Sequence, residues 1–241
     1  MIINKKYPQE AVILAGGLGT RLRPIVNDCP KCLAKIHGRP FITYLMDQIA
    51  DAGISRVILC VGYMEAMMKT VLGSCYRSME LLYSTEQYPL GTGGALRLAL
   101  SLLQTDSVIV MNGDSFCDLD LSEMFTVHKT RSAKLSIAVT SIDDVGRYGK
   151  VSMNSLGQIT KFEEKGCYSG DGYINSGIYV INQEIIIKMI PAEQSVSLEK
   201  TIFPTMIDYG LYGFLTQGKF IDIGIPVDYF RAQNFFEKYS K

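Results

Sequence analysis

The sequence predicts an α/β fold in which a mixed, mainly parallel sheet is flanked by helices. Short apolar, β-branched runs alternate with helical patterns in the first half of the chain. Each strand–helix–strand unit of this kind predicts two parallel strands with a helix covering the sheet. In the second half, strand-like runs follow one another with turn residues between them, which predicts partly antiparallel strands in a small lobe beside the sheet.

The first half supplies the parallel strands. Residues 11–15 and 56–62 are apolar, β-branched and bounded by glycine, as buried parallel strands are. Between them, residues 41–53 place apolar side chains at helical spacing and end at Gly53, a residue that favours a helix C-terminus. The other elements expected here are a strand over 80–86, a helix over 93–103 and a strand over 107–114.

The second half supplies the lobe and a last helix. The strand candidates are 134–142, 148–154, 158–165 and 172–182, followed by an apolar stretch at 220–226 and an amphipathic helix to the end. No linker, low-complexity segment or repeat separates these parts, so we expect one domain over residues 1–241. Within it we expect residues 1–130 to bind mainly nucleotide, 131–225 to bind mainly sugar phosphate, and 226–241 to form the C-terminal helix.

Composition excludes several classes of function. The 24 basic and 24 acidic residues give a net charge of +0, which argues against a nucleic-acid partner because such proteins carry a basic excess. No apolar run approaches the ~20 residues that cross a bilayer, and the N-terminus does not resemble a secretory signal. We therefore expect a cytoplasmic protein without a membrane partner, in which the six cysteines are reduced thiols.

Cys29 and Cys32 have the C-x-x-C spacing of a redox or zinc site. A zinc ribbon needs a second such pair, and a thioredoxin-like motif opens a helix after a strand. Neither context is evident, so we expect no metal or redox function for this pair.

A glycine-rich loop follows the first predicted strand. Residues 16–23 read GGLGTRLR and match neither the dinucleotide fingerprint, which requires glycine where Leu22 stands, nor the P-loop, which requires Gly-Lys-Ser/Thr. Glycine amides can approach a polyphosphate closely, and Arg21 and Lys31 add positive charge. A tight turn beside surface cations is the alternative interpretation, and the glycines alone do not decide between them.

Two aspartates interrupt apolar runs. Asp114 ends the strand over 107–114, and Asp222 lies between two isoleucines. A carboxylate in such a place is costly unless it is paired or bound to a metal. The alternative for Asp114 is a helix cap, although Ser122 offers a better one. The pair predicts Mg²⁺ held between protein carboxylates and substrate phosphates.

Two further polar clusters stand out in the second half. The charged cluster at 162–166 is, in isolation, typical of a solvated face. Asn175 and Ser176 interrupt an otherwise apolar strand.

Together these motifs resemble the sugar-1-phosphate nucleotidylyltransferases. The resemblance covers nearly the whole chain, from Leu14 to Pro226, with the motifs in the family's order. They are LAGGLGTRLRP with PKCLAKIHGRP, YSTEQYPLGTGGAL, NGDSF, YGKV, FEEK, INSGIYVI and FIDIGIP.

The resemblance implies a Rossmann-like fold and a reaction. An oxygen of a sugar 1-phosphate attacks the α-phosphorus of a nucleoside triphosphate, and pyrophosphate leaves. Positioning and charge neutralisation dominate such chemistry, and the attacking oxygen is already ionised, so no general base is required. Within the family the resemblance implies GTP as donor, heptose 1-phosphate as acceptor, Mg²⁺ as cofactor and a role in surface polysaccharide or glycan synthesis; a homo-oligomer is compatible with it.

The resemblance also implies roles for individual residues. Arg21 and Lys31 would bind the triphosphate and neutralise the leaving pyrophosphate, and Lys165 would bind the sugar's phosphate. Asp114 and Asp222 would hold the metal. The remaining positions are nucleotide contacts at Leu14, Ala15, Gly16, Gly17, Gly19, Thr20, Gln87, Gly91, Thr92 and Asp114, and sugar-phosphate contacts at Gly149, Glu164, Lys165 and Asn175.

Three alternatives stay open. A mannose-1-phosphate guanylyltransferase or a glucose-1-phosphate nucleotidylyltransferase uses the same motifs, although PLGTGGA favours guanine. A catalytically inactive sensor of nucleotide sugars is the alternative from another class, and it is disfavoured because Arg21, Lys31, Asp114, Lys165 and Asp222 are all present.

Overall fold

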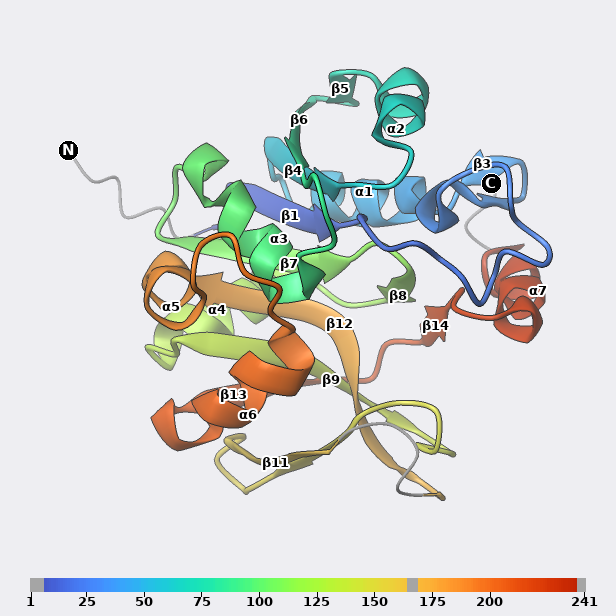
Figure 1. The fold of residues 1–241 in the computed structure, drawn as a ribbon. Helices are drawn as coiled ribbons and strands as arrows, with labels where there is room; N and C mark the ends of the chain where they lie inside the picture. The colour runs from blue at the N-terminus through green and yellow to red at the C-terminus, as the bar shows by residue number, and fades with distance from the viewer. Residues whose placement is uncertain (1–6, 164–168, 238–241) are drawn as a thin grey trace.

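The computed structural model describes residues 7–163 and 169–237, and its largest sheet has ten strands (Figure 1). Eight follow the order β11-β10-β12-β7-β1-β4-β6-β5, and β9 joins β12 to β13. The strands of this sheet are β1 Glu10–Leu14, β4 Arg56–Val61, β5 Cys75–Tyr76, β6 Met79–Thr85, β7 Ser107–Asn112, β9 Leu135–Ile142, β10 Lys150–Met153, β11 Ile159–Glu163, β12 Gly172–Asn182 and β13 Leu211–Thr216. The predicted mixed, mainly parallel α/β architecture is confirmed.

Strands β7, β1, β4 and β6 form the parallel half of the sheet. Their central residues are mostly apolar because helices cover both faces of the sheet, and successive side chains point to opposite sides. Ile13 belongs to a core with Leu45 of α1 (Ile42–Asp51), whereas its neighbour Val12 belongs to a second core with Leu96 of α3 (Gly91–Ala99). The remaining elements are β2 Lys35–Ile36, β3 Arg39–Pro40, β8 Ser115–Cys117, β14 Phe220–Asp222, α2 Glu65–Leu72, α4 Leu121–Thr130, α5 Gln183–Met189, α6 Phe203–Met206 and α7 Pro226–Phe235.

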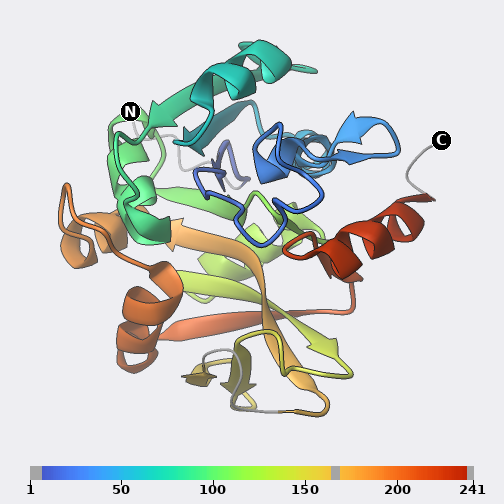
Figure 2. The ribbon, with the colours of Figure 1, turned by 45° about the vertical axis from the view of Figure 1, so that its right-hand side comes forward.

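The long strand β12 joins the two halves of the molecule (Figures 1 and 2). Its C-terminal half pairs antiparallel with β7 and its N-terminal end with β10, while β9 pairs antiparallel with both halves. The register with β9 shifts between Asn175 and Tyr179, and Gly177 has a φ of 80°. A Cβ at Gly177 would also lie 2.5 Å from Oγ of Ser115. Gly177 therefore lets β12 bend, so that this one strand belongs both to the main sheet and to the antiparallel lobe.

Several elements were absent from the sequence-based expectation. Helix α4 is the clearest case, and its N-cap is Asp120, whose carboxylate accepts hydrogen bonds from the amides of Ser122 and Glu123. The sequence offered Ser122 as a better cap than Asp114, but the cap is Asp120, because aspartate one residue before the helix reaches two amides at once. Strand β13 also breaks the antiparallel pattern, since it pairs parallel with β9.

A buried histidine links α4 to the sheet. His128 is 1% exposed, and its ring nitrogens lie 2.9 Å from Oγ of Ser136 and 3.0 Å from Oδ1 of Asn182. Burial lowers the pKa of His128 from 6.5 to about 4. The unfolded chain therefore binds more protons than the folded one between these values, and stability falls as the pH drops through this window.

We expect His128→Gln to remove this pH dependence. Between pH 7 and pH 5 the histidine should cost the wild type about 2 kcal/mol of unfolding free energy, which the variant should not lose. Urea unfolding of both proteins at the two pH values measures the difference. Equal losses of unfolding free energy in the wild type and in His128→Gln would show that His128 is charged in the folded state.

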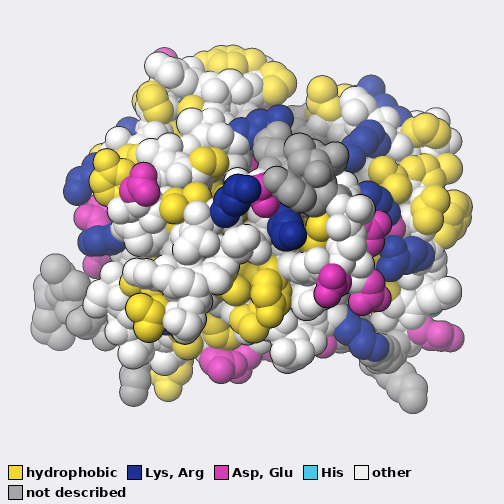
Figure 3. Space-filling model, turned by 90° about the horizontal axis from the view of Figure 1, so that it is seen from below, with side chains coloured by type: hydrophobic (Ala, Val, Ile, Leu, Met, Phe, Trp, Pro, Cys, Tyr) yellow, Lys and Arg dark blue, Asp and Glu magenta, His cyan; other side chains and the backbone are white. Residues whose placement is uncertain are grey.

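No helix in the described part of the chain is long and apolar enough to cross a membrane. Seen from below, the surface carries Lys, Arg, Asp and Glu side chains interspersed over one face (Figure 3). This mixture of signs on that face agrees with the net charge of +0 and differs from the basic footprint of a nucleic-acid site.

Candidate active site

A cavity of about 390 Å³ opens at the carboxyl ends of β1 and β7, beside the N-terminus of α3. Parallel α/β sheets bind ligands at this edge. Of the ten nucleotide contacts expected from the sequence, nine line the cavity: Leu14, Ala15, Gly16, Gly17, Gly19, Thr20, Gly91, Thr92 and Asp114. The tenth, Gln87, is exposed and does not line it.

The loop after β1 is held at both ends. The amide of Ala15 donates to the carbonyl of Cys60 at 2.8 Å, and the amide of Leu22 donates to the carbonyl of Gly19 at 3.0 Å. Leu22 is 1% exposed, so its side chain anchors the loop in the core. Gly19 has a φ of 62°, a conformation that favours glycine. The glycines therefore form a fixed turn that also lines the cavity, and phosphate binding by this loop stays a prediction.

Glu86 is a cavity residue that the sequence analysis missed. It follows β6, lines the cavity and accepts a hydrogen bond from the amide of Leu90 at 3.0 Å through Oε2. A Cβ at Gly16 would lie 2.6 Å from its Oε1, and one at Gly62 would lie 2.9 Å away. Two glycines at neighbouring strand ends thus make room for this carboxylate. The signal available in the sequence was its position directly after a strand, one residue before the predicted nucleotide contact Gln87.

Two cations and two carboxylates meet at the rim of the cavity. Nζ of Lys31 donates to Oδ2 of Asp114 at 2.7 Å, and the Lys31 side chain is only 12% exposed. A Cβ at Gly224 would lie 3.2 Å from Oδ1 of Asp222, 3.5 Å from Nζ of Lys31 and 3.6 Å from Nη2 of Arg21. Residues distant in sequence therefore surround one small space.

The pairing of β14 with β8 explains why the aspartates are neighbours. Asp222 lies opposite Ser115 in this two-stranded sheet, and the amide of Ile223 donates to the carbonyl of Asp114 at 2.9 Å. Burial raises the pKa of Asp222, the Gly224 amide opposes this shift, and the charge of Asp114 adds to it. A desolvated carboxylate beside another one favours a cation between them.

A second cavity, of about 480 Å³, adjoins the first. The two share Arg21, Lys31, Asn112, Asp114 and Gly224. The second is also lined by Gly149 and Asn175, predicted sugar contacts, and by Asp222, a predicted metal ligand. Further lining residues that the sequence did not single out include Tyr148, Phe162, Ser197, Glu199 and Phe220. Glu164 and Lys165, predicted to bind the sugar and its phosphate, lie outside the described residues.

Cys32 of the C-x-x-C pair lines the first cavity but is 3% exposed. Burial raises its pKa to about 12, so the thiol is protonated near neutral pH, and a protonated thiol is a poor nucleophile and metal ligand. Burial also raises the pKa of the half-buried Cys29. Among residues 7–163 and 169–237, no group of three or more His, Cys, Asp and Glu side chains could hold a metal by itself.

Two adjoining cavities with Arg21 and Lys31 at their junction have the layout expected of a transferase for anionic substrates. Residues 10–239 match the model of the nucleotidyl transferase family, and the chain belongs to this family. This finding confirms the resemblance and identifies the chain as an enzyme of the nucleotidyltransferase class.

Relatives of known activity match almost the whole chain. It is 37% identical over 230 residues to the D-glycero-α-D-manno-heptose 1-phosphate guanylyltransferase of Aneurinibacillus thermoaerophilus, covering 95% of this chain and 99% of that protein. It is 33% identical to the mannose-1-phosphate guanylyltransferase of Mycobacterium tuberculosis, covering 92% of this chain and 63% of that one.

Solved structures match the fold of this chain as well. HddC from Yersinia pseudotuberculosis matches with a TM-score of 0.83 at 35% identity, covering 95% of this chain and all of that one. The same protein has been solved in complex with GMP-PN.

Proposed function

We propose that the chain transfers the guanylyl group of GTP to a sugar 1-phosphate, with D-glycero-α-D-manno-heptose 1-phosphate as the acceptor, and releases GDP-sugar and pyrophosphate. The match to a heptose 1-phosphate guanylyltransferase over 95% of the chain supports this proposal, as does the complex of HddC with GMP-PN. Such a GDP-sugar would supply surface polysaccharide or glycan synthesis from the cytoplasm.

The choice of guanine rests on Glu86. Guanine presents adjacent N1–H and N2–H donors on one edge, and a carboxylate is acceptor-only, so one carboxylate can accept from both. Adenine has an acceptor at N1 and therefore does not match. In the described part of the chain, Oε1 of Glu86 receives no donor, while Oε2 is oriented by the Leu90 amide. Burial raises the pKa of Glu86, although the Leu90 amide opposes the shift.

We expect Glu86→Gln to lower kcat/KM for GTP by about 10- to 100-fold, since hydrogen bonds to a charged group are lost. The ratio of kcat/KM for GTP to kcat/KM for ATP should fall as well. Pyrophosphate release with heptose 1-phosphate and each of GTP, ATP, CTP and UTP measures both effects. Gln87→Ala is the comparison: unchanged GTP kinetics there would support Glu86 as the base-binding residue, whereas a larger loss than in Glu86→Gln would restore the sequence-based assignment to Gln87.

Mg²⁺ is the cofactor we propose, held by Asp114 and Asp222. The fit rests on the half-buried Asp222 carboxylate, on its neighbour Asp114, and on the usual binding of Mg²⁺ by one or two carboxylates together with substrate phosphates. When bound, the ion would neutralise charge on the reacting phosphates. Two protein carboxylates, with no third His, Cys, Asp or Glu ligand among the described residues, agree with that mode of binding.

We assign the remaining roles by position. Arg21 and Lys31 lie where both cavities meet, which supports their neutralising the leaving pyrophosphate. Gly149 and Asn175 line the second cavity and would contact the acceptor sugar. Glu164 and Lys165 keep the roles that the resemblance implies. Testing heptose, mannose and glucose 1-phosphates with GTP decides the acceptor.

A further inference from the structure

Residues 194–199 pack against the glycine-rich first turn of α3. The amide of Gly93 donates to the carbonyl of Val196 at 2.8 Å, and the amide of Val196 donates to the carbonyl of Leu90 at 2.9 Å. A Cβ at Gly94 would lie 2.4 Å from the carbonyl oxygen of Gln194. At least one glycine of the PLGTGGA motif is therefore needed for packing, because any side chain there would displace this segment.

The segment leads to Glu199, a half-buried carboxylate that lines the second cavity. Its Oε2 accepts hydrogen bonds from Oγ1 of Thr92 at 2.7 Å and from Oγ of Ser197 at 3.0 Å. Thr92 in turn lines the first cavity, and its Oγ1 accepts from the amide of Leu198 at 2.8 Å. One threonine thus connects the wall of the nucleotide cavity to a carboxylate in the other cavity.

A buried phenol fixes the other oxygen of the carboxylate. Tyr179 is 0% exposed, and its hydroxyl accepts from Nδ2 of Asn175 at 3.0 Å and from Nδ2 of Asn112 at 3.4 Å. Its single proton is then donated to Oε1 of Glu199 at 3.4 Å. Burial raises the pKa of Tyr179, which keeps this proton in place.

Every hydrogen bond of this network is therefore donated toward Glu199. A carboxylate has about four acceptor positions, and the three donors named above leave it able to accept one more hydrogen bond from the cavity. A phosphate group is repelled by the negative charge, whereas a hydroxyl is a suitable donor. The acceptor sugar offers several hydroxyls.

We propose that Glu199 accepts a hydrogen bond from a ring hydroxyl of the acceptor sugar and that Thr92, contacting it from the nucleotide cavity, holds it in position. This inference rests on the proposed function. Glu199 is then a substrate-binding residue, and Thr92 is a positioning residue that acts through it.

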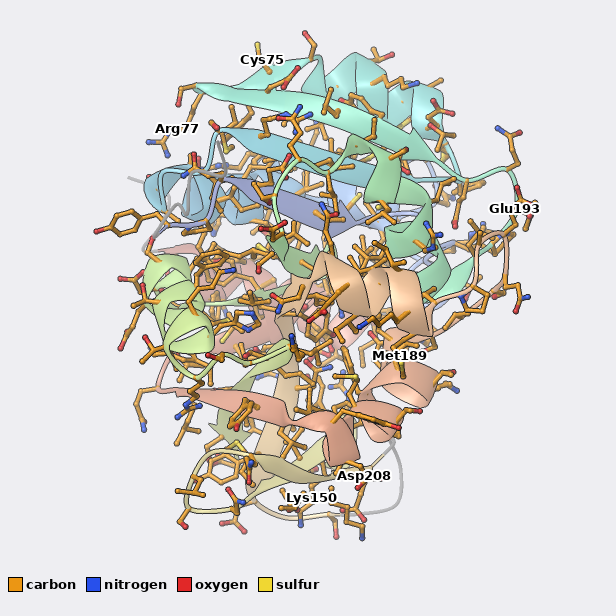
Figure 4. The ribbon with its side chains drawn as sticks, turned by 90° about the vertical axis from the view of Figure 1, so that its left-hand side faces the viewer. Cys75, Arg77, Lys150, Met189, Glu193 and Asp208 are labelled. Carbon is orange, nitrogen blue, oxygen red and sulfur yellow. The ribbon has the colours of Figure 1, made fainter. Side chains whose placement is uncertain are left out.

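The decisive variant is Glu199→Gln, which keeps the shape of the side chain and removes its charge. The KM for the sugar 1-phosphate should rise about 10- to 100-fold, while the KM for GTP should stay within about twofold. The matched control is Glu193→Gln, whose side chain lies at the edge of the molecule (Figure 4) and should leave both constants unchanged. Equal sugar KM values in Glu199→Gln and the wild type would overturn the proposal.

Deoxy acceptors test the contact directly. With the wild type, one of the 2-, 3- and 4-deoxy forms of the best acceptor 1-phosphate should have a kcat/KM about 10- to 100-fold below that of the parent acceptor. With Glu199→Gln, the kcat/KM of the same analogue should be only about twofold below that of the parent acceptor. If the variant discriminates against each deoxy analogue as strongly as the wild type, Glu199 does not bind a hydroxyl.

Thr92→Val tests the positioning role, because valine keeps the shape and lacks the hydroxyl. The sugar KM should rise by about 3- to 10-fold, as expected for loss of one hydrogen bond, and Thr92→Ser should restore it. Failure of serine to restore the constant would show that Thr92 acts by packing. Wild-type inactivity with GTP and every sugar 1-phosphate would overturn the proposed function itself, whereas an active wild type with an unaffected Glu199→Gln would overturn only this inference.

Discussion

Replacing Lys31 by methionine is expected to lower kcat for pyrophosphate release by about 10²- to 10³-fold, the usual cost of removing one group that stabilises transition-state charge. The Lys31 side chain is 12% exposed and its ammonium lies 2.7 Å from Asp114, at the junction of the two cavities. Methionine fills the same space without a charge. The loss should appear in kcat, because the charge on the leaving pyrophosphate develops only as the bond to the α-phosphorus breaks.

The control for this variant is Lys35→Met, on an exposed lysine of β2. It removes one positive charge from the same region and should leave kcat unchanged. Thermal unfolding of both variants shows whether they remain folded. A Lys31→Met protein that is folded and retains wild-type kcat would exclude Lys31 from the chemistry.

Asp222→Asn is expected to abolish Mg²⁺-dependent turnover, with a loss of at least about 10³-fold, while leaving the fold intact. Asparagine can still accept the hydrogen bond that the Gly224 amide donates to Oδ1 at 2.9 Å. Without the metal, stability should be equal to or higher than that of the wild type. The reason is that the half-buried Asp222 anion has a raised pKa and lies near the charge of Asp114, so its removal relieves an unfavourable interaction.

Mg²⁺ titrations of the melting temperature, with GTP present, test the same assignment without activity. The wild type should be stabilised by the ion and Asp222→Asn should not. Asp208→Asn, on an exposed aspartate that lines neither cavity (labelled in Figure 4), should behave as the wild type does. Full stabilisation of Asp222→Asn by Mg²⁺ would place the metal elsewhere.

The sequence predicted the parallel core correctly because its strands are apolar and β-branched and are separated by helical periodicity. The same reasoning missed α4, whose apolar pattern is short, and it named Ser122 rather than Asp120 as an available cap in this segment. Serine and aspartate are both good caps, and only the folded backbone shows that Asp120 reaches the amides. The parallel pairing of β13 with β9 depends on a long-range contact that no local pattern reports.

The site was predictable where a residue type is unusual for its surroundings. Asp222 between isoleucines and the glycines after β1 stood out in this way. Glu86 and Glu199 did not, since a glutamate next to other polar residues is ordinary in a sequence. What distinguishes Glu86 is the space left by Gly16 and Gly62, and that becomes visible only when three strand ends are placed together.

The pairing of β14 with β8 also affects how the enzyme forms during synthesis. Asp114 and Lys31 precede most of the chain, whereas Asp222 reaches them only when β14 docks on Ser115. A nascent chain that has emerged only through β8 thus has the glycine loop and Asp114 without the second carboxylate. Closing this contact requires a large loop to be ordered, which slows folding. Partly synthesised chains should therefore have no complete metal site, and the capacity for turnover should arise late, when β14 joins the fold.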